Sequence, residues 1–355
     1  MKRINRVLSL IATMAMISMC FAPAVIADGS QYKFYSDQDQ GQLMQYVSEN
    51  ANRYFEAVER NPELYGLRSG ADLSVSSPFS IFDGETGDIT DHSGVLIYDR
   101  GEVVGYFWIV PVGHHMSMTM SLGNAENLDS LENENVRWVD EDGDIYAIGE
   151  NHSELILDNK KIDTNMPSIN DIDVTQSAVR TIMPIVVKAS NNDKPTEMKN
   201  LRVNIVLQGN HPWCWAATCA AIINYEKDTN LTAEEVATYV FGSPIDRGGR
   251  WSDMKKAYDH WEMGDVYETR ALTYDETKAA INSDSPIHMG LYSDIGGHSM
   301  TLRGYSKFND GYILYSAIDP NYDNYVYFEG SENYYGSYYV LGGHNFYWER
   351  ARMGW

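Results

Sequence analysis

Cys214 is the residue of this sequence best placed to do chemistry. It lies between two tryptophans in the stretch QGNHPWCWAATCAAIINYE (208–226), where an apolar run that predicts a helix begins. Unpaired N–H groups and the dipole at the start of a helix favour the charged thiolate of a cysteine. Gln208, six residues earlier in a Gly-Asn turn, is placed to donate its amide to an oxyanion beside the backbone N–H of Cys214. This pattern makes Cys214 a candidate nucleophile.

A thiol nucleophile also needs a base, and His298 is the histidine best placed to act as one. In GGHSMTLRGYS (296–306) it follows two glycines at the start of a predicted strand, and the glycines let a substrate backbone come close. In ILYSAIDPNY (313–322) Asp319 ends the next strand, 21 residues after His298. If these strands pair as a hairpin, Asp319 can hold one imidazole nitrogen and direct the other toward Cys214.

The remaining cysteine and histidines have plainer interpretations. His344 also follows two glycines, and we interpret it as a turn histidine. Cys219 points into the apolar face of the predicted helix, as a small core residue does. Two ligand pairs at zinc-like spacing are absent, so we predict no metal and no cofactor. The histidines considered and rejected as metal ligands beside Cys214 are His211, His260 and His288.

Residues 1–27 predict a secretory signal peptide. Basic residues precede an apolar run, and Val25 and Ala27 fit a small-x-small cleavage site. The alternative is a lipoprotein signal with Cys20 as the lipidated residue, for which Met19 is too large a neighbour. No other segment has about 18 uninterrupted apolar residues, so we expect a secreted protein without a membrane span after signal removal.

Charge and cysteine content exclude two further features. The net charge is −23, and no basic patch of the kind that binds nucleic acid is present. Only Cys214 and Cys219 remain after signal removal. Because they lie five residues apart on one predicted helix, they point about 140° apart and cannot form a disulfide with each other.

Residues 28–187 are predicted to form one helix followed by an antiparallel sheet. Apolar residues recur at helical spacing over 36–60, and GVLIYDRGEVVGYFWIV (94–110) predicts a hairpin. The acidic run at 139–149 lacks the glycine position and the bidentate glutamate of a calcium loop, and it predicts a second hairpin. The polar stretch KASNNDKPTEMKN (188–200) predicts a linker.

Residues 201–355 are predicted to form an α+β domain. A strand-like run at 201–207 comes first, and three helices follow. Thr232 and Thr273 each begin a capping box, and another helix is predicted to start at Ser252. Strand patterns then continue to the end of the chain, so helices precede the sheet.

These residues resemble the papain-like cysteine peptidases. That pattern has Gln, five residues, Cys-Trp, a distant His, and then Asn or Asp before Pro, and the likeness is strongest to the secreted bacterial staphopain branch. It covers about residues 200–355 and includes the terminal aromatic strand FYWERARMGW. The resemblance implies a papain-like fold and a polypeptide substrate. By match it implies the roles of nucleophile, general base, oxyanion donor and histidine orienter for Cys214, His298, Gln208 and Asp319.

The chain departs from the family pattern at two places. Asp319 stands where the family usually has Asn, and an anion there should hold the imidazolium more strongly and raise the pKa of His298. Asn321 and Tyr322 stand where the staphopain branch carries a Trp. The shielding of the Asp–His pair from water is therefore open.

The resemblance further implies that residues 28–187 are an inhibitory prosegment, a half-barrel sheet with a helix, removed by cleavage within 188–200. The leading hypothesis is a secreted bacterial cysteine endopeptidase made as a zymogen, which hydrolyses peptide bonds through an acyl-thioester on Cys214. One alternative is an acyltransferase of the transglutaminase type, which shares the order Cys, His, Asp but is disfavoured by Gln208. The other is a secreted binding protein on an inactive peptidase scaffold.

Overall fold

The structure is a computed structural model of the chain. It describes residues 32–36, 40–112, 115–123, 128, 130–131, 134–141, 144–157, 178–182, 187, 194–293, 296–334, 336–341 and 344–355. The predicted signal peptide, with Cys20, and residues 188–193 of the predicted linker lie outside this part. Within the described residues no helix is long and apolar enough to cross a membrane.

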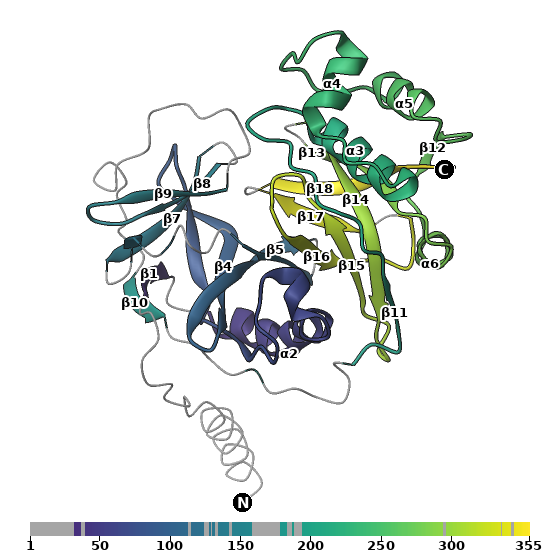
Figure 1. Cartoon of the computed structure of the whole chain (residues 1–355). Helices are drawn as coiled ribbons and strands as arrows, with labels where there is room; N and C mark the ends of the chain where they lie inside the picture. Colours follow the sequence, from purple (N-terminus) through teal and green to yellow (C-terminus); the bar gives the residue numbers. More distant parts are fainter. Residues whose placement is uncertain are drawn as a thin grey trace, which may run out of the picture.

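The N-terminal unit combines one long helix with a sheet (Figure 1). Helix α2 (Gly41–Glu59) buries one face, as its apolar spacing predicts, and the ring of Tyr54 on that face lies 5.2 Å from the ring of Phe107 in the sheet. The other elements of the unit are β1 (Tyr32–Ser36), η1 (Pro62–Tyr65), β2 (Leu73–Val75), β3 (Phe79–Asp83), β4 (Ile89–Asp99), β5 (Glu102–Val112), β6 (His115–Leu122), β7 (Asn135–Glu141), β8 (Asp144–Ile148), β9 (Ser153–Leu157) and β10 (Ala178–Ile182).

The hairpin predicted at 94–110 is confirmed. Strands β4 and β5 pair antiparallel up to Asp99 and Glu102. The two residues between them, Arg100 and Gly101, have φ angles of 53° and 92°. Two positive φ angles match a tight turn to the twist of the strands. The prediction of a purely antiparallel sheet is wrong, because β7 pairs in parallel with β1 and with β3.

The C-terminal unit places helices before most of its strands, as predicted, and the strand pairs that the structure describes within it are antiparallel. Helix α3 packs against β13 and β14 (Figure 1). The elements are β11 (Glu197–Asn200), α3 (Cys214–Lys227), α4 (Ala233–Phe241), α5 (Trp251–His260), β12 (Tyr267–Arg270), α6 (Tyr274–Asn282), β13 (Ile287–Ser293), β14 (Gly296–Lys307), β15 (Ile313–Ile318), β16 (Tyr325–Glu329), β17 (Tyr338–Leu341) and β18 (His344–Met353).

Two of the three predicted helix starts are confirmed in detail. Thr232 and Thr273 each accept a bond from the backbone of the glutamate three residues later, which completes both capping boxes. The third helix starts one residue before Ser252. Its first turn is held by the carboxylate of Asp253, which accepts a bond from the backbone N–H of Arg250 at 2.9 Å.

The prediction of a strand at 201–207 is wrong, because this segment lies outside the sheet ladders. The backbone N–H of Leu201 donates to the carbonyl of Arg303 at 2.7 Å, and its own carbonyl accepts from Nε of the same arginine at 2.8 Å. Leu201 and Val203 are buried, and Arg202 is exposed. The alternation that predicted a strand therefore reflects one buried side of the chain.

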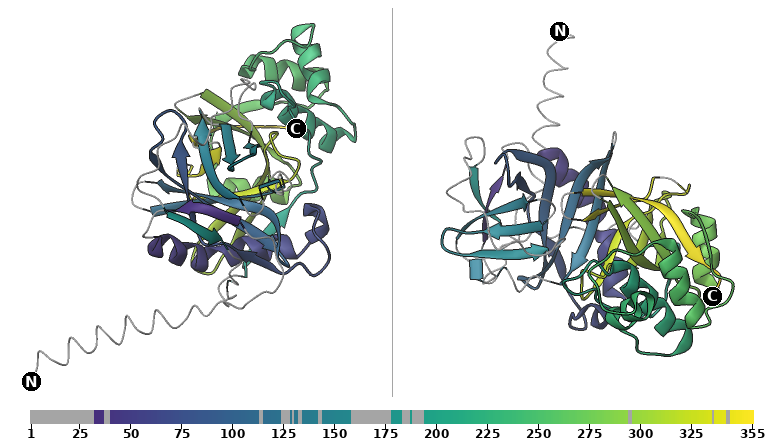
Figure 2. Two further views of the ribbon diagram at one scale, coloured as in Figure 1. Left: turned by 90° about the vertical axis from the view of Figure 1, so that its left-hand side faces the viewer. Right: turned by 90° about the horizontal axis from the view of Figure 1, so that it is seen from above.

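The two units meet edge to edge. Strand β6 pairs antiparallel with β16, with Met120 opposite Tyr327. Around this pairing, Arg53 forms an ion pair with Asp310 at 2.5 Å, and the hydroxyl of Tyr65 contacts that of Tyr327. One hydrophobic core extends through both units. Figure 2 shows the units side by side in the view from above.

Candidate active site

Cys214 is the first residue of α3, as predicted, and it is half-buried. The tryptophans on either side of it hold an exposed loop. The indole N–H of Trp213 donates to the carbonyl of Ile245 at 3.0 Å, and that of Trp215 donates to the carbonyl of Arg247 at 3.3 Å. The loop after α4 is therefore fixed beside the thiol.

His298 and Asp319 come together through the predicted pairing of their strands. Strand β14 carries His298 near its start, and Asp319 follows the last residue of its antiparallel partner β15. His298 Nε2 lies 2.9 Å from Asp319 Oδ1, and both side chains are buried. Cys214 lies close enough to His298 to contribute to the raised pKa of its ring. The structure thus brings all three residues into one cluster.

The electrostatics of this cluster favour an ion pair. Burial by itself lowers the pKa of His298, but the charge and hydrogen bond of Asp319, with help from Cys214, raise that pKa to about 10. Burial by itself raises the pKa of Asp319, but the bonds from His298, Tyr339 and the backbone of Asn321 bring that pKa below its usual range. An imidazolium facing a carboxylate is the favoured state.

Tyrosines enclose the acidic side chain. The hydroxyl of Tyr339 donates to Asp319 Oδ2 at 2.6 Å, and the backbone N–H of Asn321 donates to Oδ1 at 2.9 Å. Tyr322 is 1% exposed, and its hydroxyl accepts a 3.4 Å bond from that of Tyr106 in the N-terminal unit. Tyrosine rings thus surround the pair in this chain, although the Trp of the staphopain pattern is missing.

The sequence interpretation missed two of these tyrosines. Tyr339 lies on β17, 20 residues after Asp319, and Tyr106 lies on β5 in the other unit. Neither residue belongs to a motif or stands at a spacing that marks it. The only signal is the abundance of tyrosine, 25 residues in the chain, which cannot select a position.

Gln208 lies at the turn that carries Asp319. Its backbone N–H donates to the carbonyl of Pro320 at 3.0 Å. Its side-chain oxygen is buried and has no hydrogen-bond partner within the described residues. The segment that leads to Cys214 is therefore attached directly to the turn that follows β15.

The histidines considered as metal ligands lie apart. His211 Nδ1 lies 2.5 Å from a carboxylate oxygen of Asp246, and the ring of His260 stacks on that of Tyr239 with centroids 3.6 Å apart. His288 is fully buried elsewhere. In the part of the chain that the structure describes, no three His, Cys, Asp or Glu side chains form a group that could hold a metal.

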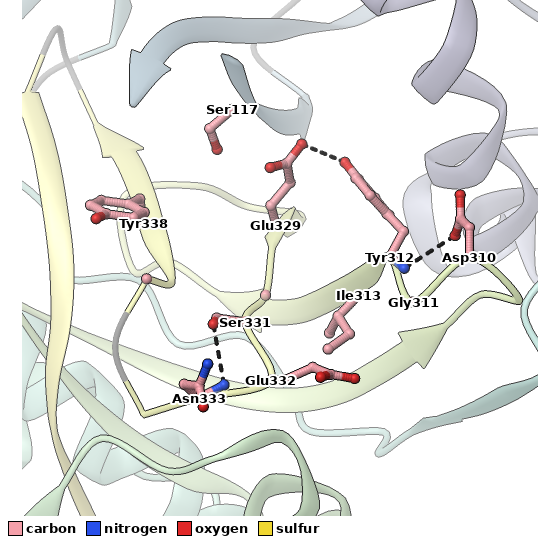
Figure 3. Close-up of a pocket in the computed structure, with 12 residues that line it drawn as sticks. Ser117, Asp310, Gly311, Tyr312, Ile313, Glu329, Ser331, Glu332, Asn333 and Tyr338 are labelled. Atoms are coloured by element: carbon pink, nitrogen blue, oxygen red, sulfur yellow. Dashed lines mark hydrogen bonds between the residues drawn. The ribbon is translucent and has the colours of Figure 1, made fainter. Parts of the chain in front are cut away.

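A separate acidic cavity of about 610 Å³ lies where the two units join (Figure 3). Ser117 of β6 faces it from the N-terminal unit, and Glu329 and Tyr338 face it from the C-terminal unit. Glu329 accepts a bond from the hydroxyl of Tyr312 at 2.6 Å. The cavity lining contains none of Cys214, His298, Asp319 and Gln208.

Residues 200–344 match the sequence profile of the Peptidase_C39 like family. This match supports a cysteine peptidase of the papain-like superfamily in the C-terminal unit, and the mixed α+β fold is compatible with it. Among solved structures, UfSP from C. elegans overlaps with 46% of this chain at 11% identity and a TM-score of 0.29, a likeness too low to carry an argument. The chain covers 36% of that structure's length. No curated protein matches the chain.

Proposed function

We propose that the chain is a secreted cysteine endopeptidase made as a zymogen, related to the staphopain branch. The observation that carries this proposal is the buried His298–Asp319 pair, with Cys214 at the start of α3 close enough to His298 to contribute to the raised pKa of the ring. A base that is oriented by a third group and that contacts a nucleophile is the arrangement of covalent hydrolases. The family match over residues 200–344 supports the same class of reaction.

In the first half of the proposed reaction the thiolate of Cys214 attacks the carbonyl carbon of a peptide bond. A carbon–sulfur bond forms, and the carbonyl oxygen becomes an oxyanion next to the backbone N–H of Cys214 and the amide of Gln208. The imidazolium of His298 then gives its proton to the amine that leaves. Asp319 holds Nε2, which leaves Nδ1 as the nitrogen that serves Cys214.

In the second half, water cleaves the acyl-thioester. Neutral His298 takes a proton from the water as it attacks, and the carbon–sulfur bond breaks to restore the thiolate–imidazolium pair. Asp319 stays ionised throughout and stabilises the imidazolium each time it forms. The tyrosine enclosure keeps water from this carboxylate, which strengthens its interaction with the ring.

We assign residues 28–187 the role of inhibitory prosegment and residues 188–200 that of processing region. Contacts of the N-terminal unit support this assignment, because they reach the turn that follows Asp319 and the sheet that carries the site. Tyr106 reaches Tyr322 beside Asp319, and β6 extends the sheet at β16. His344, at the start of β18, lies close enough to His92 of the N-terminal unit to contribute to the lowered pKa of His92.

The test is casein hydrolysis and self-processing of the full-length chain, with Cys214→Ala and His298→Ala compared with His344→Ala. We expect the first two variants to lose both activities and the third, which changes the rival histidine, to keep them. Casein hydrolysis by Cys214→Ala would overturn the proposal. Addition of a primary amine separates the acyltransferase alternative, because incorporated amine without new fragments would identify a transferase.

A further inference from the structure

A chain of buried polar side chains runs beneath the candidate site, from α3 to β14. The thiol of Cys219 lies close enough to Tyr258 for each to affect the pKa of the other, and the hydroxyl of Tyr258 lies 2.7 Å from His288 Nδ1. His288 Nε2 lies 3.2 Å from the hydroxyl oxygen of Ser299. None of the four side chains is more than 4% exposed. We call this set the Cys219–Ser299 chain.

The protonation states keep every member of this set uncharged. Burial, with a contribution from Arg352, lowers the pKa of His288 well below its usual range, so the ring is neutral. Burial raises the pKa of Cys219 to about 12 and raises that of Tyr258 well above its usual range, so both keep their protons. Two directions satisfy every member: Tyr258 O–H donates to Nδ1 while Nε2–H donates to Ser299, or Nδ1–H donates to Tyr258 while Ser299 O–H donates to Nε2. In either direction His288 bonds to a partner through both of its ring nitrogens.

The ends of the Cys219–Ser299 chain lie on the two elements that carry the reacting side chains. Ser299 directly follows His298 on β14, and Cys219 follows Cys214 by five residues, about 7.5 Å along the helix axis. The middle members come from α5 and β13. The Cys219–Ser299 chain therefore connects the helices of the C-terminal unit to its sheet at the level of the site.

Apolar packing alone would hold α3 only loosely in register with the sheet. The buried residues around Cys219 are mostly alanines, and a short side chain makes few van der Waals contacts. Hydrophobic contact has no direction, whereas hydrogen bonds fix distance and angle. The buried alanines in question are Ala216, Ala217, Ala220 and Ala221.

We propose that Cys219, Tyr258 and His288 are positioning residues that set the distance between Cys214 and His298. The proposal rests on the proposed function, because it concerns the geometry of that reaction. This proposal gives a role to Cys219, which the sequence suggests is only a small core residue. It also gives a role to His288, which belongs to no group that could hold a metal within the described residues. A displacement of about 1 Å between reacting groups is enough to lower a rate about 100-fold.

The experiment measures kcat and KM on one peptide substrate for the full-length chain after self-processing. For Tyr258→Phe we expect kcat to fall about 10- to 100-fold with KM changed less than about threefold, because binding surfaces stay intact and only alignment is lost. Cys219→Ser keeps a donor and should retain most of the activity that Cys219→Ala loses. The matched control is Tyr325→Phe, which removes another buried hydroxyl whose 2.9 Å bond goes to the carbonyl of Val203.

The possible outcomes distinguish a role in the alignment of Cys214 and His298 from a role in the stability of the fold. If Tyr258→Phe and Tyr325→Phe lower the melting temperature alike but only the former lowers kcat, the proposal holds. If Tyr258→Phe keeps kcat while the unmodified chain is active and Cys214→Ala is not, the Cys219–Ser299 chain only stabilises the fold and the inference is wrong. A fully active Cys214→Ala protein would instead refute the proposed function itself.

Discussion

Replacement of Asp319 by Asn should move the upper pH limit of activity. In the intact chain, the buried carboxylate lies 2.9 Å from His298 Nε2 and is the main reason that the pKa of His298 rises from 6.5 to about 10. An amide keeps the hydrogen bond but removes the charge. Burial disfavours the charged imidazolium, and in this variant no negative charge of residue 319 offsets that effect, so the pKa of His298 falls.

The size of the effect follows from the protonated fraction. With a pKa of about 10, His298 is almost fully protonated at about pH 8.5. If the pKa falls to the ordinary 6.5, only about 1% of the rings carry the proton that the leaving amine needs. We therefore expect Asp319→Asn to lower kcat/KM about 100-fold at about pH 8.5 and less than about twofold at about pH 5.5.

The assay is kcat/KM on a peptide substrate between pH 5 and 10. The matched control is Asp323→Asn, which removes an exposed carboxyl from the same turn. The basic limb of the Asp319→Asn profile should shift downward by several pH units, while that of Asp323→Asn should coincide with the unmodified chain. An unchanged basic limb in Asp319→Asn would refute the claim that this carboxylate controls the ionisation of His298.

Three further changes test the surroundings of the site. Tyr339→Phe removes a 2.6 Å bond to a buried carboxylate and should lower the free energy of unfolding by about 2 kcal/mol in urea titrations, whereas Tyr338→Phe should not. Gly249→Ala would place a Cβ atom 2.3 Å from the ring of Trp215. We therefore expect weaker substrate binding, seen as a higher KM, and a free energy of unfolding that is lower by about 1–3 kcal/mol. An unchanged KM and an unchanged free energy of unfolding would contradict the tight packing. Burial lowers the pKa of His92, so the folded chain binds this proton more weakly than the unfolded one. The contribution of His92 to stability should be full above about pH 6.5 and fall as the pH drops toward its folded-state pKa, and His92→Gln should flatten that fall in thermal melts.

The core of the site was predictable because its signals are local. A helix start, a glycine pair before a strand and a carboxylate at the end of the next strand can each be read within about ten residues. A hairpin-like pairing of neighbouring strands then brings His298 to Asp319 without knowledge of the rest of the fold. The capping boxes at Thr232 and Thr273 were predictable for the same reason.

The enclosure of the site was not predictable because it depends on which distant segments meet. Tyr106 reaches Tyr322 only because β6 joins β16 at the edges of the two units, and strand edges leave no mark in a sequence pattern. The error at 201–207 has a related cause. Alternating burial predicts that one side of a segment is covered, but it does not say whether a neighbouring strand or the side chain of Arg303 satisfies the backbone.

The most direct test of the central claim is the rate of alkylation of Cys214 by iodoacetamide from pH 4 to 9, followed by intact mass. The full-length chain after signal removal is compared with the chain cleaved in the region 188–200, and Cys214→Ser is the blank. We expect one label, at Cys214, with a rate that is already high in mildly acidic solution and greater after cleavage. Cys219 stays unlabelled because it is fully buried. Slow labelling that rises only in alkaline solution, and equally in both forms, would contradict an activated nucleophile.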